Sequence, residues 1–143
     1  MATWVAYDSA KNRQWNGNAL DFDTGSTLKV ALVTSSYTPD QTNHDFWNDA
    51  SANEVSGTNY TAGGIALGTK VVSTTGHVTT FTAASITWTQ SGAGFVTARY
   101  AILYNDTGTS STSALVAFAD LTVNRGNVTG DLTFQFPTGL LTS

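Results

Sequence analysis

The stretch that decides the fold is Thr27-Leu28-Lys29-Val30-Ala31-Leu32-Val33, followed by an irregular segment over residues 34–60. Leu28, Val30 and Leu32 recur at every second position, which is the period of a half-buried β-strand. After this strand the periodicity stops, and Asn, Asp, Ser and Thr fill many positions. An irregular segment of more than about 15 residues inside a compact domain is usually functional or disordered. The sequence therefore predicts a strand and then one long irregular loop, which we call the excursion (residues 34–60).

Aromatic side chains in the excursion argue against disorder. Phe46 and Trp47 are costly to leave in water, so we expect them to hold the excursion against the domain or against a partner. We predict that the excursion contacts a neighbouring subunit through Phe46, Trp47, Asp49 and Tyr60. Replacement of Trp47 by alanine is then expected to weaken that contact and to leave the isolated fold intact.

Local patterns around the first strand predict further elements. Residues 4–8 alternate as a short strand, whereas residues 11–18 are polar and predict a loop in which Trp15 covers the edge of the core. Within the excursion, residues 44–49 predict one helical turn capped by Asn43.

The C-terminal half of the chain predicts closely spaced strands. After a backbone bend at Gly63-Gly64, segments 65–72 and 78–82 flank a turn in which Gly76 can adopt the positive φ of a tight hairpin. Segment 95–104 is apolar on both faces, which is typical of a strand at the centre of a sheet or at a subunit contact. Further strands are predicted at 86–89, where Trp88 is expected in the core, at 114–118 and at 129–136.

The predicted elements define a fold class. They amount to eight or nine short strands without a long helix, joined by Gly, Asn and Ser turns. This spacing predicts an all-β fold, an antiparallel β-sandwich of jelly-roll or Greek-key type. A chain of 143 residues suits one domain, so we expect residues 1–143 to form a single β-sandwich.

Composition and charge exclude several kinds of partner. Charged residues make up 11% of the chain, and the net charge is -4 with a pI near 4.7. The 6 basic residues are scattered, so we expect no nucleic-acid partner, which would need clustered Lys and Arg. Cysteine is absent, which excludes disulfides and thiolate chemistry. We also expect neither a signal peptide nor a membrane span, because no apolar run is long enough.

Residue patterns that would indicate catalysis are sparse. His44 and His77 are the only histidines, they lie far apart in the sequence, and no Gly-x-Ser-x-Gly motif accompanies them. We therefore expect no enzymatic activity, no cofactor and no transition-metal site. Two alternatives stay open, a structural calcium ion and a carbohydrate platform. Residues for the first are Asp21, Asp23, Asp40, Asp45 and Asp49, and those for the second are Trp4, Trp15, Trp47 and Trp88.

Four motifs occur in a definite order along the chain. They are the strand at 28–32, Phe46-Trp47 with Asp49, the segment Asn53-Glu54-Val55-Ser56-Gly57-Thr58-Asn59-Tyr60-Thr61-Ala62-Gly63-Gly64, and the strand at 98–104. Together these motifs resemble small virion structural proteins encoded by tailed bacteriophages. The resemblance extends from about Thr27 to the C-terminus. Residues 1–26 lie outside it, and an N-terminal arm that exchanges between copies is one expectation for them.

The resemblance implies a non-enzymatic role on a virus particle. Its most direct implication is a capsid decoration (cement) protein on the outer surface of the phage head, where it stabilises contacts between major capsid subunits. Such proteins are typically homotrimers over threefold positions, so the expected partners are the major capsid protein and further copies of this chain. Alternatives are a tail, neck or fibre component of the same virion, or a carbohydrate-binding jelly-roll module.

Overall fold

The computed structural model describes residues 4–17, 21–22, 27–135 and 141–142. In this part of the chain, helical structure is confined to α1 (Asp8–Trp15) and two short 3-10 helices, η1 (Trp47–Asp49) and η2 (Ser51–Asn53). The strands are β1 (Trp4–Ala6), β2 (Leu28–Val33), β3 (Ile65–Ala66), β4 (Val71–Thr75), β5 (Val78–Thr82), β6 (Ile86–Trp88), β7 (Ala98–Asn105), β8 (Leu115–Arg125), β9 (Leu132–Phe134) and β10 (Leu141–Thr142). The prediction of an all-β fold is confirmed.

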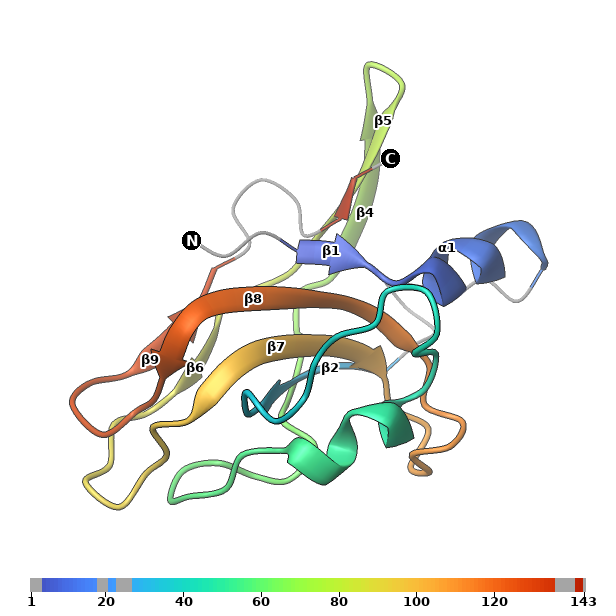
Figure 1. The fold of residues 1–143 in the computed structure, drawn as a ribbon. Coiled ribbons are helices and arrows are strands. Elements are labelled where there is room, and N and C mark those ends of the chain that lie inside the picture. Colours follow the sequence, from blue (N-terminus) through green and yellow to red (C-terminus); the bar gives the residue numbers. More distant parts are fainter. Residues whose placement is uncertain (1–3, 18–20, 23–26, 136–140, 143) are drawn as a thin grey trace.

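The strands form antiparallel sheets (Figure 1). The largest sheet has the order β1-β8-β7-β2-β3, and two smaller sheets have the orders β10-β5-β4 and β6-β9. β7 and β8 are the longest strands and curve through the body of the molecule (Figure 1). The arrangement is consistent with an antiparallel sandwich, whereas the jelly-roll or Greek-key type stays a prediction.

The large sheet is covered on both faces at its central strand, β7. In β7, Ala101 and Leu103 belong to one apolar cluster, whereas Ile102 and Tyr104 belong to a second cluster. Alternate residues of a strand point to opposite faces, so both faces of β7 are covered. β7 lies between β2 and β8, which resolves the two alternatives left by segment 95–104 in favour of a central strand.

The first apolar cluster joins the large sheet to the smaller sheets. Phe81 of β5, Trp88 of β6 and Phe134 of β9 pack in the same cluster as residues from β2, β7 and β8. Trp88 is 1% exposed, which confirms its predicted place in the core. Its ring meets that of Phe134 edge-on, with the ring centroids 5.8 Å apart. This is the packing of two β layers around a shared core.

The excursion covers the opposite face of the large sheet. Tyr37, Trp47 and Ala50 join the second cluster, where they pack with residues of β2, β7 and β8. Backbone bonds fasten the segment at its middle and toward its C-terminal end: the Trp47 N–H donates to the Ser113 carbonyl at 2.8 Å, and isolated bridges pair residue 46 with 114 and residue 54 with 33. The long loop is therefore a cover for the domain's own sheet.

The loop predicted over residues 11–18 is wrong, because the chain forms α1 there. Trp15 is 90% exposed and so does not cover the core edge. Ala10 is the buried residue of this helix, and such a short apolar face gives little helical periodicity in the sequence. The available signals were Asp8 in the first turn and Gly17, which follows the helix with a φ of +77°.

The helical turn predicted over residues 44–49 is shorter than expected, and Asn43 does not cap it. The turn is η1, and the Asp49 Oδ2 atom accepts the N–H groups of Asp45 at 2.9 Å and Phe46 at 3.3 Å. The Asn43 side chain donates instead to Asp40 Oδ2 at 2.8 Å. An aspartate inside the turn thus satisfies the free N–H groups that precede it.

The predicted hairpin is confirmed. β4 and β5 are joined by Gly76-His77, whose φ values of +59° and +66° are those of a type I′ turn. The strand predicted at 65–72 is divided into β3 and β4, because Thr69 has a φ of +47° and interrupts the extended backbone. β9 lies within the strand predicted at 129–136, whose last residue falls outside the described residues.

Candidate interaction surfaces

Trp47, the first of the predicted interface residues, lies inside the domain. It is 7% exposed, and its ring stacks on Tyr104 with the centroids 4.6 Å apart and the planes at 5°. The expectation that Trp47→Ala leaves the isolated fold intact is therefore revised, because the substitution removes a buried ring from the second cluster.

Tyr60 is also engaged within the domain. Its hydroxyl donates to Glu54 Oε1 at 2.7 Å and accepts the Leu32 N–H at 3.0 Å. Its ring stacks on Trp88 with the centroids 6.0 Å apart. Burial raises the pKa of Tyr60 well above its ordinary value, so the hydroxyl stays protonated and acts as a hydrogen-bond donor. Tyr60 packs against the first cluster, whereas Trp47 belongs to the second, so the structure does not bring these two residues together.

Phe46 and Asp49 lie at the outer side of the excursion. Phe46 is half-buried, and the Arg13 guanidinium lies 4.9 Å from its ring centroid. Asp49 is exposed. Of the four predicted interface residues, Asp49 is exposed, Phe46 and Tyr60 are half-buried, and Trp47 is buried. A partner contact at these residues stays a prediction.

The motif over residues 53–64 has a structural explanation. Glu54 Oε1 accepts both the Tyr60 hydroxyl and, at 2.6 Å, the Gly63 N–H. The Tyr104 hydroxyl donates to the Gly63 carbonyl at 2.6 Å. Gly64 has a φ of +84°, and a Cβ there would lie 2.0 Å from the Val30 carbonyl oxygen. The glutamate, tyrosine and glycines of the motif thus close the excursion onto β2, and the predicted bend at Gly63-Gly64 is confirmed.

A second polar network fastens the excursion at its other end. The Tyr7 and Tyr37 hydroxyl oxygens are 2.8 Å apart, and the Tyr37 hydroxyl lies 2.9 Å from His44 Nδ1, which also accepts the Asp40 N–H at 3.1 Å. Burial raises the pKa of Tyr37 to about 12, so the hydroxyl is neutral at physiological pH. The network holds these polar side chains in place under the excursion. The other histidine, His77, lies in the turn between β4 and β5. The histidines do not meet.

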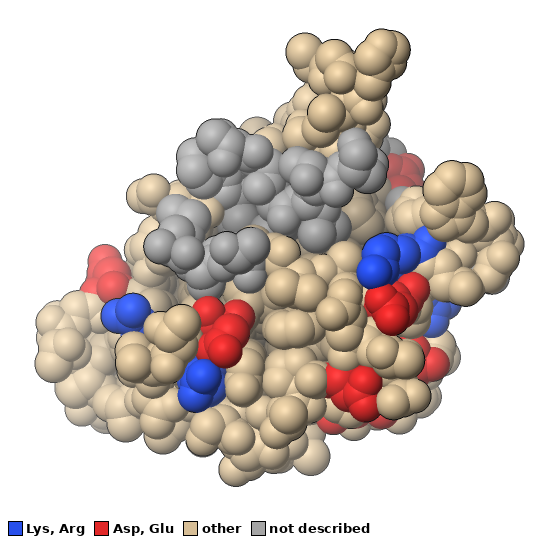
Figure 2. Space-filling view, turned by 45° about the horizontal axis from the view of Figure 1, so that its top comes forward, with Lys and Arg blue, Asp and Glu red and all other residues tan. Residues whose placement is uncertain are grey.

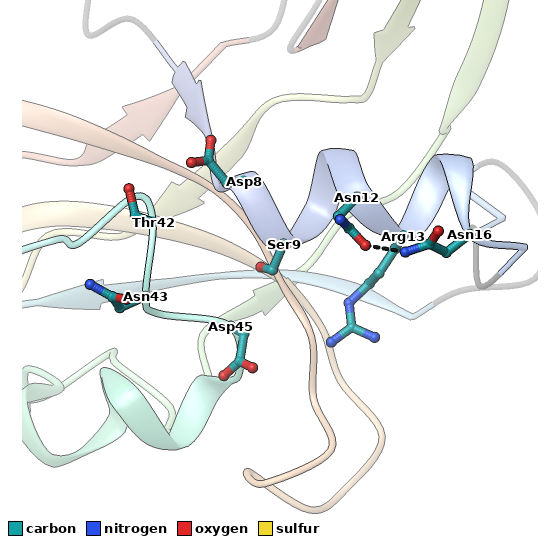
Figure 3. A pocket seen from close by; sticks show the side chains of 8 residues that line it. All are labelled: Asp8, Ser9, Asn12, Arg13, Asn16, Thr42, Asn43 and Asp45. Atoms are coloured by element: carbon teal, nitrogen blue, oxygen red, sulfur yellow. Dashed lines mark hydrogen bonds between the residues drawn. The ribbon is translucent and has the colours of Figure 1, made fainter.

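A polar pocket opens between α1 and the excursion (Figure 3). Its volume is about 400 Å³, and Figure 3 shows the Arg13 side chain extending from α1 toward the turn that carries Asp45. The Arg13 Nε atom is buried without a hydrogen-bond partner, and the exposed ring of Trp15 lies on the same helix. The lining groups are hydroxyls, amides and charged groups of Asp8, Ser9, Asn12, Arg13, Asn16, Thr42, Asn43 and Asp45. Such a lining suits a small polar ligand.

The loop aspartates do not assemble into a calcium site in the described part of the chain. Asp40 binds the N–H groups of residues 42 and 43, and Asp49 binds those of residues 45 and 46. Among the described residues, no group of three or more His, Asp or Glu side chains could hold a metal ion. Asp23 lies outside the described residues.

The β4–β5 hairpin is the most conspicuous free surface. It projects from the body in Figure 1, and its tip stands clear of the other atoms in Figure 2. Val71, Val72 and Val78 are 47%, 41% and 45% exposed. The segment from Val71 to Ala98 contains no Asp, Glu, Lys or Arg, and His77 is the single histidine of the hairpin. The sequence predicts the hairpin but not its projection from the body. The absence of charged residues over 71–98 is the sequence signal that could have indicated a contact surface there.

Searches for relatives of this chain gave no match: no family model, no curated protein and no solved structure resembles it at a significant level. In the described residues, no helix is both long and apolar enough to cross a membrane.

Proposed function

We propose that this chain is a non-enzymatic structural protein that acts by binding other protein subunits. The sequence resemblance supports a bacteriophage capsid decoration protein on the outer surface of the head, where it would stabilise contacts between major capsid subunits. The observation that carries the proposal is the projecting, uncharged β4–β5 hairpin with its three exposed valines. Its assignment to a virion comes from the resemblance.

The hairpin has the chemistry of an interface. Protein interfaces contain few charged residues at their centre. The burial of exposed apolar groups by a partner is favourable, because it removes apolar surface from water. The aromatics of the excursion are largely used to cover the domain's own sheet, whereas the valines of the hairpin stay exposed. A protein that stabilises a particle by burying surface area needs such an exposed surface, because a partner can bind it without rearrangement of the core.

The test is to mix purified protein with undecorated mature capsids, pellet the particles and image them by cryo-electron microscopy. The proposal expects regular protrusions on the head surface, over contacts between major capsid subunits. Val78→Lys is expected to reduce occupancy by about tenfold, because it places a charge in a buried contact. Val96→Lys is the matched control, since Val96 is 58% exposed on the body and its replacement should leave occupancy unchanged. If capsids stay bare while the protein is folded, the protein does not bind the head and the decoration role is refuted. If images show the protein bound to tails, the alternative of a tail component is favoured.

The pocket beside α1 favours glycan binding as a second candidate function. Amide, hydroxyl and carboxylate groups line it, and Trp15 offers an exposed ring on the same helix for a sugar to stack against. A glycan array probed with and without calcium tests this. Trp15→Ala and Asn43→Ala should each abolish any hit, whereas an array without hits removes the candidate.

A further inference from the structure

We propose that the free edge of β4 binds β4 of a second copy, so that two hairpins form one continuous antiparallel sheet about a twofold axis. The inference rests on the proposed function, in which the hairpin is a contact surface for assembly. It names the partner that the edge takes.

Among the described residues, β4 is an edge strand that no other segment covers. It is the last strand in the order β10-β5-β4, and all of its residues are exposed. An edge strand presents unpaired N–H and C=O groups, and proteins usually protect such edges with Lys, Pro, a bulge or a covering segment. β4 contains no Lys or Pro, and its pairing with β5 runs without a register shift from Val71 to Thr75.

The direction of the backbone groups follows from the turn. In a two-residue type I′ hairpin, the residues that flank the turn, Thr75 and Val78, exchange hydrogen bonds, and bonded and non-bonded pairs then alternate along the ladder. Thr75, Ser73 and Val71 therefore direct their backbone groups toward β5. Val72 and Thr74 direct theirs outward, to the free edge.

Charge selects a second copy as the occupant. Each copy has a net charge of -4, so a contact between two copies is least opposed where charged side chains are absent. The hairpin contains no Asp, Glu, Lys or Arg, and two copies can meet there without bringing like charges together. A strongly charged partner would gain no ion pairs at this edge, because the hairpin has no acidic or basic side chain of the Asp, Glu, Lys or Arg type.

One register uses the full length of the strand. With Ser73 on the twofold axis, Val72 of each copy pairs with Thr74 of the other through the outward backbone groups, and Val71 lies opposite Thr75. The two Ser73 residues form a non-hydrogen-bonded pair, in which Cα atoms are about 4.5 Å apart. That separation lies within the range that a disulfide spans.

A cysteine pair tests the register. The natural chain has no cysteine, so Ser73→Cys introduces the single thiol. We expect Ser73→Cys to form a disulfide-linked dimer under mild oxidation. Thr75→Cys is the matched control on the same strand, because the two Thr75 residues would lie about 13 Å apart, four positions along the ladder, and should not cross-link. Cross-linking of Thr75→Cys with none at Ser73→Cys would overturn the register.

A charge pair tests the association itself. Sedimentation equilibrium of the unmodified chain over a concentration series should give a monomer–dimer equilibrium. Ser73→Lys places two positive charges directly opposite each other and should weaken dimerisation by about fivefold or more. Thr75→Lys, which faces Val71, should change it far less, and circular dichroism should show both variants folded.

The outcomes separate this inference from the proposed function. A dimer that Ser73→Lys dissociates supports the inference, even when capsids stay bare. A monomer at every concentration overturns it, and so does a trimer that Ser73→Cys fails to cross-link. If a monomer binds capsids and Ser73→Lys abolishes that binding, the edge takes a capsid strand instead of a second copy, and the inference is wrong while the proposed function stands.

Discussion

Trp47→Ala is the substitution that most directly tests how the excursion works. The Trp47 ring is 7% exposed, stacks on Tyr104 at 4.6 Å, and belongs to the cluster that covers the second face of the large sheet. Truncation of a buried Trp to Ala costs about 3–5 kcal/mol in a core that cannot collapse around the gap. The lost ring stacking accounts for about 0.5–1.5 kcal/mol of the interaction beyond area burial.

This cost is large relative to the stability of a domain. Native domains are stable by about 5–15 kcal/mol, so the variant should still fold but unfold at a much lower urea concentration. Trp15→Ala is the matched control, because the same side chain is 90% exposed there and its loss should change stability by less than about 0.5 kcal/mol.

Urea unfolding followed by far-UV circular dichroism measures both variants, since this signal does not depend on the tryptophans' own fluorescence. A stability loss below about 1 kcal/mol for Trp47→Ala, or equal losses for the two variants, would refute the stacking argument. A loss of the expected size would make Trp47→Ala a poor probe of partner binding. Asp49→Ala, at an exposed position, would then be the better substitution for testing a contact on the excursion.

Further predictions concern the backbone bend, a buried amide and the pH dependence of stability. Gly64→Ala should cost more than about 2 kcal/mol in urea unfolding, because the new Cβ would overlap the Val30 carbonyl and the φ of +84° is strained for alanine. Asn127 is 0% exposed and its side chain bonds three backbone groups, so Asn127→Asp should cost about 3 kcal/mol at neutral pH. Burial would raise the pKa of the new carboxyl above its unfolded value, and the cost should therefore shrink as the pH falls toward 4. Lys29 lies 2.7 Å from Asp106 and lowers its pKa, so the pair stabilises the fold above the unfolded pKa of about 3.9 and loses its effect as the pH falls through the folded pKa. Asp106→Asn should remove that part of the acid sensitivity in thermal melts between about pH 2 and pH 5, and an unchanged pH profile would contradict the assignment.

Helix α1 could not be predicted from hydrophobic periodicity, because it is a short, polar surface helix. Its sequence is polar, and burial is confined to Ala10, so the helical period that identifies an amphipathic helix is missing. Capping signals at Asp8 and Gly17 were present but weaker than the polar composition that favoured a loop. Trp15 could not be placed without the helix, because its exposure depends on which side of α1 meets the sheet.

The sequence by itself determined the strands, because alternation of side chains is a local property of extended backbone. The period at Leu28, Val30 and Leu32, and the glycine of the β4–β5 turn, predicted a strand and a hairpin that the structure contains. Only the tertiary structure decided what covers each face of the large sheet. The excursion has no period of its own, so its cover of β7 through Trp47 depends on long-range contacts that no local pattern encodes. The exposure of the hairpin is decided in the same way, since Val72 and Val78 resemble core residues in sequence and become surface residues because nothing in the described fold packs over them.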